Sequence, residues 1–147
     1  MGSKLIQGVK ITPLSIVHHP QGNIMHALKS SSPGFCGFGE AYFSFVHKGE
    51  IKGWKKHKRF SLNLVVPVGG IRFVAFDDRH NSCTKHNFFD VILGLGFQYS
   101  RLTVPPGIWV SFRGIKDVNM LMNIIPEEHD PTESENLALN AIPYAWM

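Results

Sequence analysis

Short strand-like segments follow one another along most of the 147-residue chain, and this pattern limits the possible folds more than any other feature. Each segment is rich in β-branched and aromatic residues and is bounded by Gly, Pro or Asn, as β-strands usually are. The predicted strands are residues 9–14, 24–28, 41–47, 61–68, 71–76, 88–93, 100–104, 108–112 and 118–125. The one predicted helical piece is a short acidic turn at 132–139. The spacing predicts an all-β protein, either a sandwich or a barrel.

Glycine and proline mark three places where the path of the backbone is predictable. Gly69-Gly70 separates two apolar strands and predicts a tight hairpin, because both glycines can adopt positive φ. The segment 105–107, Pro-Pro-Gly, predicts a reversal of the chain. Pro67 lacks a backbone N–H inside a strong strand pattern, which predicts an edge position or a β-bulge there.

The composition indicates one globular domain spanning residues 1–147. With 44% hydrophobic and 18% charged residues, a chain of this length can bury one sizeable core. No run of eighteen apolar residues and no secretory signal pattern is visible, so we expect a cytoplasmic protein without a membrane partner. Cys36 and Cys83 lack the spacing of a zinc site or a disulfide framework and are expected to be reduced thiols.

The formal charge of +4 is unevenly distributed along the chain. The acidic C-terminal segment 126–147 carries five acids and no Lys or Arg, whereas six cations crowd residues 48–59. Such a concentration of cations suits a phosphorylated ligand. Nucleic acid is not expected as a partner, because the cations form one patch and no known binding motif accompanies them. A solvent-exposed, lysine-rich strand edge is the other interpretation. The basic cluster consists of Lys48, Lys52, Lys55, Lys56, Lys58 and Arg59.

Five segments in order along the chain resemble the dTDP-4-dehydrorhamnose 3,5-epimerase family of cupins. They are residues 49–58 (GEIKGWKKHK), 70–79 (GIRFVAFDDR), 82–84, 102–107 (LTVPPG) and 142–146 (IPYAW). The resemblance implies a cupin jelly-roll β-barrel (double-stranded β-helix), usually a homodimer. It implies an enzyme that acts on a nucleotide-linked 4-keto sugar in deoxysugar synthesis for bacterial surface polysaccharides. Catalysis in that family uses a His base and a Tyr acid, with no metal or organic cofactor.

The chain departs from the family pattern at three positions. Lys55 stands where the family has its catalytic His, Val110 where it has a second His, and Asn63 where it has a Lys. The expected activity is therefore epimerase-like, with a rearranged catalytic set. Two alternatives stay open. His57-Lys58 matches a pattern of related nucleotide-sugar 3,4-ketoisomerases, and the loss of both histidines also fits a non-catalytic nucleotide-sugar-binding cupin.

Alternation along strands predicts which polar residues meet the ligand. If residues 54–66 were largely extended, Lys55, His57 and Asn63 would share one face, and Asn123 would lie on the polar face of a later strand. His57 is the predicted catalytic residue, the alternative being a hydrogen-bonded or solvent-facing histidine. Lys55 is predicted either to act as a base in its neutral form, or to bind phosphate or polarise the ketone.

The remaining predicted site residues rest mainly on the resemblance. Lys52 matches the family's phosphate-contacting Arg, and Arg59 and Arg72 are further predicted substrate-binding cations. Trp109 and Phe112 follow the 105–107 turn and are expected either to stack on the ligand or to pack in the core. His129 falls near the family's proton-donating Tyr and could replace it, although a surface-loop histidine is the alternative. No metal site is predicted, because the metal-binding pattern of other cupins is absent around His57.

Overall fold

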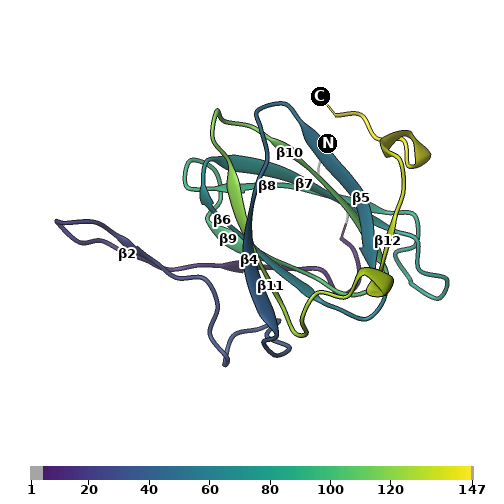
Figure 1. Cartoon of the computed structure of the whole chain (residues 1–147), viewed down its shortest axis with the longest axis horizontal. Helices are drawn as coiled ribbons and strands as arrows, with labels where there is room; N and C mark the ends of the chain where they lie inside the picture. Colours follow the sequence, from purple (N-terminus) through teal and green to yellow (C-terminus); the bar gives the residue numbers. More distant parts are fainter. Residues whose placement is uncertain (1–4, 147) are drawn as a thin grey trace.

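Two antiparallel sheets of five strands face each other in the computed structural model, which describes residues 5–146. The first sheet has the order β1 (Lys10–Pro13), β9 (Ser100–Val104), β6 (Leu62–Val68), β11 (Met120–Ile125), β4 (Glu40–Phe45). The second has the order β12 (Ser134–Asn136), β5 (Ile51–His57), β10 (Ile108–Gly114), β7 (Gly70–Asp77), β8 (Phe88–Gly94). Together they enclose a barrel (Figure 1). The predicted all-β class and the cupin jelly roll are confirmed.

The main core lies between the sheets, where alternate side chains of both point inward. Leu64 and Leu102 from the first sheet pack in the same buried cluster as Phe73 and Val110 from the second. The alternation of side chains along β6, β9, β10 and β7 places these apolar side chains on the inner face of each sheet. Burial of this face stabilises the barrel by roughly 25 cal/mol for each Å² of apolar surface removed from water.

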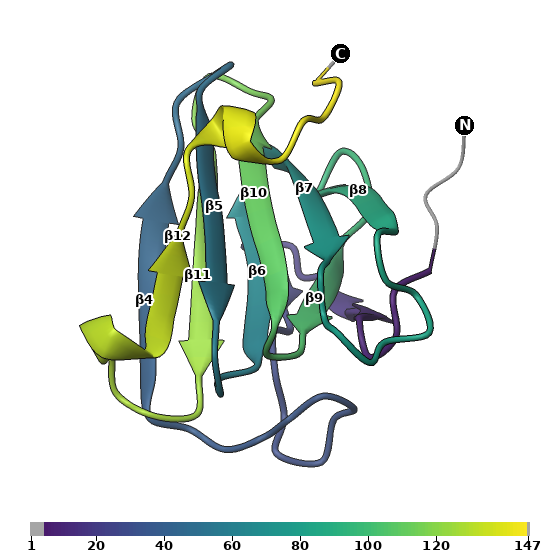
Figure 2. The ribbon, with the colours of Figure 1, turned by 90° about the vertical axis from the view of Figure 1, so that its right-hand side faces the viewer.

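A second apolar cluster lies on the outer face of the β5–β10–β7–β8 sheet. Trp54, Val74 and Trp109 are buried there under Ile142 of the C-terminal segment. This segment runs from the 3-10 helix η1 (Pro131–Glu133) through β12 to the 3-10 helix η2 (Leu139–Ala141), alongside β5 (Figure 2). The predicted helical turn at 132–139 is therefore wrong over most of its length, because these residues pair with the free edge of β5.

The predicted turns have mixed outcomes. Gly69-Gly70 does not form a hairpin, because β6 and β7 belong to different sheets and the chain crosses between them. Gly69 still needs its positive φ of 79°, and a Cβ there would lie 2.1 Å from the Val118 carbonyl oxygen. The reversal at 105–107 is confirmed, with Gly107 at φ 86°. Pro67 lies where the register of β6 against β11 shifts, so the bulge is confirmed and the edge position is not.

The short strands β2 (Ile16–Val17) and β3 (Ile24–Met25) form a ribbon that projects from the barrel (Figure 1). Val17 and Ile24 are exposed on it. The strand predicted at 24–28 is thus confirmed only for its first two residues. Among residues 5–146, no helix is long and apolar enough to cross a membrane.

Candidate functional site

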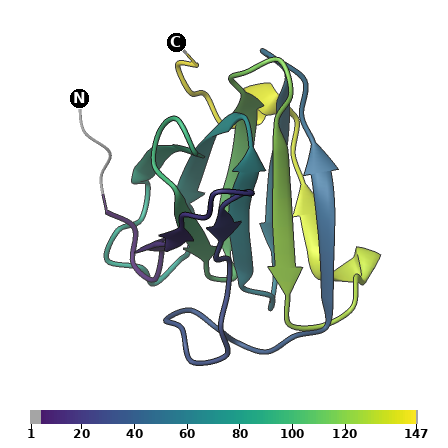
Figure 3. The same cartoon turned by 90° about the vertical axis from the view of Figure 1, so that its left-hand side faces the viewer.

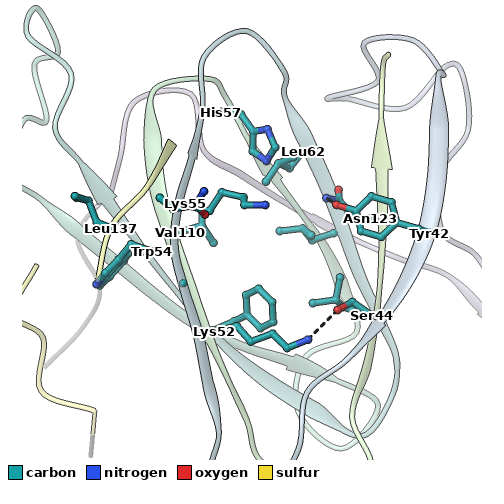
Figure 4. Close-up of a pocket in the computed structure, with 15 residues that line it drawn as sticks. Tyr42, Ser44, Lys52, Trp54, Lys55, His57, Leu62, Val110, Asn123 and Leu137 are labelled. Atoms are coloured by element: carbon teal, nitrogen blue, oxygen red, sulfur yellow. Dashed lines mark hydrogen bonds between the residues drawn. The ribbon is translucent and has the colours of Figure 1, made fainter. Parts of the chain in front are cut away.

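A cavity of about 330 Å³ opens inside the barrel (Figure 4). This volume lies at the lower end of the ~300–1,000 Å³ range of small-molecule sites. Aliphatic and aromatic side chains form much of its wall, and polar groups converge from β4, β5 and β11. The lining residues are Tyr42, Ser44, Lys52, Gly53, Trp54, Lys55, His57, Leu62, Leu64, Val110, Phe112, Leu121, Asn123, Asn136 and Leu137.

His57, the last residue of β5, is held by Glu133 of the C-terminal segment. The Nδ1 atom of His57 lies 2.6 Å from Oε1 of Glu133, and the two residues are 9% and 1% exposed. The other carboxylate oxygen accepts hydrogen bonds of 2.9 Å from the backbone N–H groups of Arg59 and Phe60. The Phe60 ring stacks on the imidazole, with the centroids 5.9 Å apart. Both the position and the rotation of the His57 ring are thereby fixed.

The ionisation of Glu133 determines the tautomer of His57. Burial alone would raise the pKa of Glu133, but the hydrogen bonds from Arg59 N–H, the His57 ring and Phe60 N–H outweigh it and lower that pKa. An ionised carboxylate only accepts hydrogen bonds, so Nδ1 of His57 carries the hydrogen. In the neutral form of the imidazole, Nε2 then has a free lone pair, and it has no hydrogen-bond partner within residues 5–146. An imidazole oriented in this way can remove a proton from a ligand in the cavity.

Two lysines make the cavity electropositive. Lys55 reaches into it from β5, and Lys52 lies nearer one end, where its Nζ donates to Ser44 Oγ at 3.2 Å and to the Phe45 carbonyl at 2.6 Å (Figure 4). None of the lining residues is an Asp or Glu. An uncompensated ammonium group in such a site stabilises a negatively charged oxygen of a ligand or of a reaction intermediate.

Tyr42 and Asn123 form a polar pair on the wall opposite Lys55 (Figure 4). Asn123 Nδ2 donates to the Tyr42 hydroxyl at 3.0 Å, which leaves the hydroxyl hydrogen of Tyr42 available to a ligand. Asn123 is 4% exposed, and its Oδ1 is a buried acceptor without a partner among the described residues. The placement of Asn123 in the cavity agrees with the alternation predicted for its strand.

The predicted common face of Lys55, His57 and Asn63 is wrong. Strand β5 ends at His57 and β6 begins at Leu62, and the turn between them changes the alternation. Leu62 and Leu64 therefore line the cavity, whereas Asn63 points out of the barrel. There its Oδ1 accepts from Thr103 Oγ1 at 2.7 Å and from Arg101 Nε at 3.1 Å, and its Nδ2 donates to the Gly34 carbonyl.

Half of the basic cluster contacts the acidic C-terminal segment. Arg59 contacts Glu127 at 3.0 Å and Asp130 at 3.5 Å, and Lys56 contacts Glu135 at 3.6 Å. Lys58 Nζ donates to the Thr132 carbonyl, and Lys48 pairs with Asp117 outside the segment. The cluster predicted as one phosphate-binding patch is thus divided: Lys52 and Lys55 face the cavity, and the other four lie outside it.

Of the other predicted site residues, some line the cavity and others lie outside it. Phe112 lines the cavity, as does Val110. Trp109 points outward into the second apolar cluster, with the Lys56 ammonium 4.9 Å from its ring centroid. Arg72 is on the same outer face and forms a two-pronged ion pair with Asp90, which also accepts from the Tyr144 hydroxyl. His129 lies in an exposed loop, outside the cavity lining.

Two residues of the site were not predicted from the sequence. Glu133 is one of five acids in a C-terminal segment whose composition resembles a solvated tail. Tyr42 is one of three aromatic residues in the segment 40–45, and the sequence does not single it out from the other two. No local signal distinguishes either residue, because both gain their roles from strands that are distant in sequence. Within residues 5–146, no group of three or more His, Cys, Asp or Glu residues could hold a metal ion.

The fold and the cavity define a cupin barrel with an internal polar site. A comparison with protein-family models and with curated protein sequences gave no match. A dTDP sugar isomerase structure from Desulfovibrio desulfuricans G20 is 32% identical, with a TM-score of 0.91 over 98% of this chain and 95% of that one. The chain belongs to the cupin family of dTDP-sugar isomerases and epimerases that includes dTDP-4-dehydrorhamnose 3,5-epimerase, and its function is nucleotide-sugar epimerase-like.

More distant structures share the fold. A double mutant of ChmJ, a 3'-monoepimerase from Streptomyces bikiniensis, in complex with dTDP matches all of this chain and 78% of its own, with 15% identity and a TM-score of 0.88. The dTDP-4-dehydrorhamnose 3,5-epimerase from Bacillus anthracis str. Ames, with TDP and PPi bound, matches 93% of this chain and 85% of its own. Its identity is 19% and its TM-score 0.80. The resemblance inferred from the sequence motifs is confirmed.

Proposed function

We propose that the protein catalyses proton transfer at the carbon next to the ketone of a dTDP-linked 4-keto sugar. The observation that carries this proposal is the His57–Glu133 pair, because the carboxylate holds Nδ1 of the imidazole and leaves Nε2 to the cavity. The dTDP-bound and dTDP-sugar-acting relatives support the choice of ligand. No metal or organic cofactor is part of the proposed reaction.

In the proposed reaction, Nε2 of His57 removes the proton from the carbon adjacent to the ketone. The electron pair of the broken C–H bond moves to the ketone oxygen and forms an enolate, whose charge the Lys55 ammonium stabilises. The Tyr42 hydroxyl on the opposite wall is placed to return a proton or to hydrogen-bond the ketone oxygen. Lys52, at one end of the cavity, is available to a phosphate oxygen as a point charge. Lys55 thus takes a binding role at the position of the family's His.

Hydrogen exchange of the sugar in deuterated water tests this proposal. We expect the wild-type protein to place deuterium at the carbon next to the ketone of a dTDP-linked 4-keto-6-deoxy sugar, detected as loss of that proton signal by NMR. The proposal fails if no exchange occurs with dTDP-, UDP-, GDP- or CDP-linked 4-keto sugars. Tight binding without exchange would support a non-catalytic nucleotide-sugar-binding protein instead.

A 3,4-ketoisomerase is the second candidate, and it needs the same first step. The observation that favours it is the relative at 32% identity, which is a dTDP sugar isomerase. In this alternative, the proton removed from carbon 3 is returned to carbon 4. The proton of the carbon 3 hydroxyl passes to the former ketone oxygen, so that carbon 3 becomes the new ketone and carbon 4 carries a hydroxyl. Product analysis by NMR distinguishes the two reactions, since epimerisation leaves the ketone at carbon 4.

We further propose that the protein is a homodimer that acts in the cytoplasm. Support for a second copy comes from the outer face of β4 and β11, where Phe43 and Phe45 are 62% and 59% exposed beside Met122 and Met120. β4 is also an edge strand with an open backbone edge (Figure 3). The projecting β2–β3 ribbon is a further surface for a second copy. Two free cysteines, Cys36 and Cys83, are compatible with a reducing compartment.

The dimer is tested with the double variant Phe43→Glu/Phe45→Glu. We expect sedimentation equilibrium to give a dimer mass for the wild type and a monomer mass for the variant, because two buried charges without partners oppose association. Leu95→Glu is the matched control, since Leu95 is 52% exposed in the turn between β8 and β9. A monomeric wild type, or a dimer that survives both Glu substitutions at β4, would contradict the proposed interface.

A further inference from the structure

Arg101 is a buried cation outside the main cavity. It lies on β9, is 1% exposed, and its side chain points to the outer face of the sheet. Its guanidinium donates to three neutral acceptors, which are Asn63 Oδ1 at 3.1 Å, the Ala27 carbonyl at 2.9 Å and the Pro33 carbonyl at 2.6 Å. No carboxylate within residues 5–146 forms an ion pair with it.

These three hydrogen bonds leave two N–H donors of the Arg101 guanidinium without an acceptor among the described residues. A guanidinium has five N–H donors, and the three hydrogen bonds leave one N–H on each Nη atom. Burial lowers the pKa of Arg101, because removal from water disfavours the charged form of the guanidinium. A buried charge without a counter-charge is costly, and an anion bound beside it would offset that cost.

A small cavity adjoins Arg101 between β1 and the segment that follows β3. Its volume is about 130 Å³, and Arg101, His26, Lys29, Ser32, Ser15 and Thr12 supply its polar lining. Among the described residues that line it, none is an Asp or Glu. The space holds several times the ~30 Å³ that one water molecule occupies in the liquid, so a small polyatomic ion fits. The cavity is separate from the proposed catalytic cavity, because the two have no lining residue in common.

We propose that this second cavity binds a small oxyanion, phosphate or carboxylate in class, with Arg101 as its buried anchor. The free N–H donors of Arg101 can bind two oxygens of one anion, and Lys29 adds a second cation at the cavity lining. Arg101 also joins β9 to the segment 27–33 that covers the sheet, through the Ala27 and Pro33 carbonyls. Anion binding therefore stabilises the packing of this segment on the barrel.

Thermal unfolding with inorganic phosphate as the probe tests the proposal. We expect phosphate to raise Tm saturably, by about 3–6 °C at ten times its dissociation constant, relative to KCl at the same ionic strength. Acetate should act in the same direction with lower affinity. Lys29→Gln should weaken phosphate binding several-fold. Lys52→Met should leave the phosphate effect unchanged, because Lys52 is the lysine available to phosphate in the catalytic cavity; this variant therefore separates the two sites.

Ser32→Asp provides the decisive comparison, because it puts a carboxylate at the lining of the proposed site. We expect it to raise Tm without phosphate and to abolish the phosphate response. Ser31→Asp is the matched control, since Ser31 is exposed and does not line the cavity. The proposal is overturned if phosphate gives no saturable shift, if Lys52→Met removes the shift, or if the two Asp variants behave alike. None of these measurements depends on turnover. The anion-site proposal can therefore be contradicted or supported independently of the proposed reaction.

Discussion

His57→Gln is expected to slow hydrogen exchange at the sugar carbon by about 10²–10⁴-fold, the usual contribution of a positioned general base. The glutamine amide can still donate to Glu133, so the local packing is kept, but it has no basic nitrogen to accept the proton. Exchange is measured by NMR in deuterated water, and dTDP binding by calorimetry. We expect dTDP affinity to change by less than a few-fold.

His129→Gln is the control for this experiment. His129 is exposed in the loop between β11 and η1, and it does not line the cavity. We expect its exchange rate to stay within about two-fold of the wild type, since surface substitutions rarely perturb a distant site. Exchange that persists in His57→Gln within ten-fold of the wild type would rule out His57 as the base. A large loss in His129→Gln would instead support the family-like role first considered for that residue.

Glu133→Gln is expected to reduce exchange by about 10²–10⁴-fold although Glu133 lines no part of the cavity. The two backbone N–H groups of Arg59 and Phe60 need an oxygen acceptor, so the NH₂ group of the substituted amide turns toward His57. Nδ1 of His57 must then accept a hydrogen bond, which moves its hydrogen to Nε2. The base is lost through the wrong tautomer.

The tautomer itself provides a readout that a merely structural role would not change. In ¹⁵N NMR, His57 should shift from the Nδ1–H to the Nε2–H form in Glu133→Gln, while dTDP binding persists. Glu133→Asp should restore part of the activity, and Glu135→Gln should have little effect, because Glu135 is a half-exposed partner of Lys56. An unchanged tautomer combined with lost exchange would contradict the positioning role of Glu133.

Local sequence patterns predicted those features that depend on the residues of a single segment. The strands around Leu64, Phe73 and Val110 were predicted because apolar residues recur at every second position. Gly107 marked a reversal because the backbone there needs positive φ. His57 was selected by its residue type and by its place in a motif, and the structure does place it at the cavity.

Longer-range features were not predictable in this way. The prediction that Asn63 faces the cavity was wrong. Four residues, 58–61, separate β5 from β6 and change the alternation of side chains between the two strands. The prediction of a hairpin at Gly69-Gly70 was wrong. Two consecutive glycines allow the chain to turn, but they do not determine whether the strands before and after them form hydrogen bonds with each other. The basic cluster was taken as a ligand site, whereas Arg59 and Lys56 meet carboxylates more than 65 positions away.

The sequence by itself determined the all-β class, most strand positions and the family resemblance. Only the tertiary structure decided which polar residues meet. The register of β12 on β5 pairs Ser134 with His57 and so brings Glu133 to the imidazole, and closure of the two sheets sets Tyr42 and Asn123 opposite Lys55. The physical reason is that backbone hydrogen bonds between strands are nearly independent of side-chain identity. Strand order and register follow from burial of the whole core, which no single segment encodes.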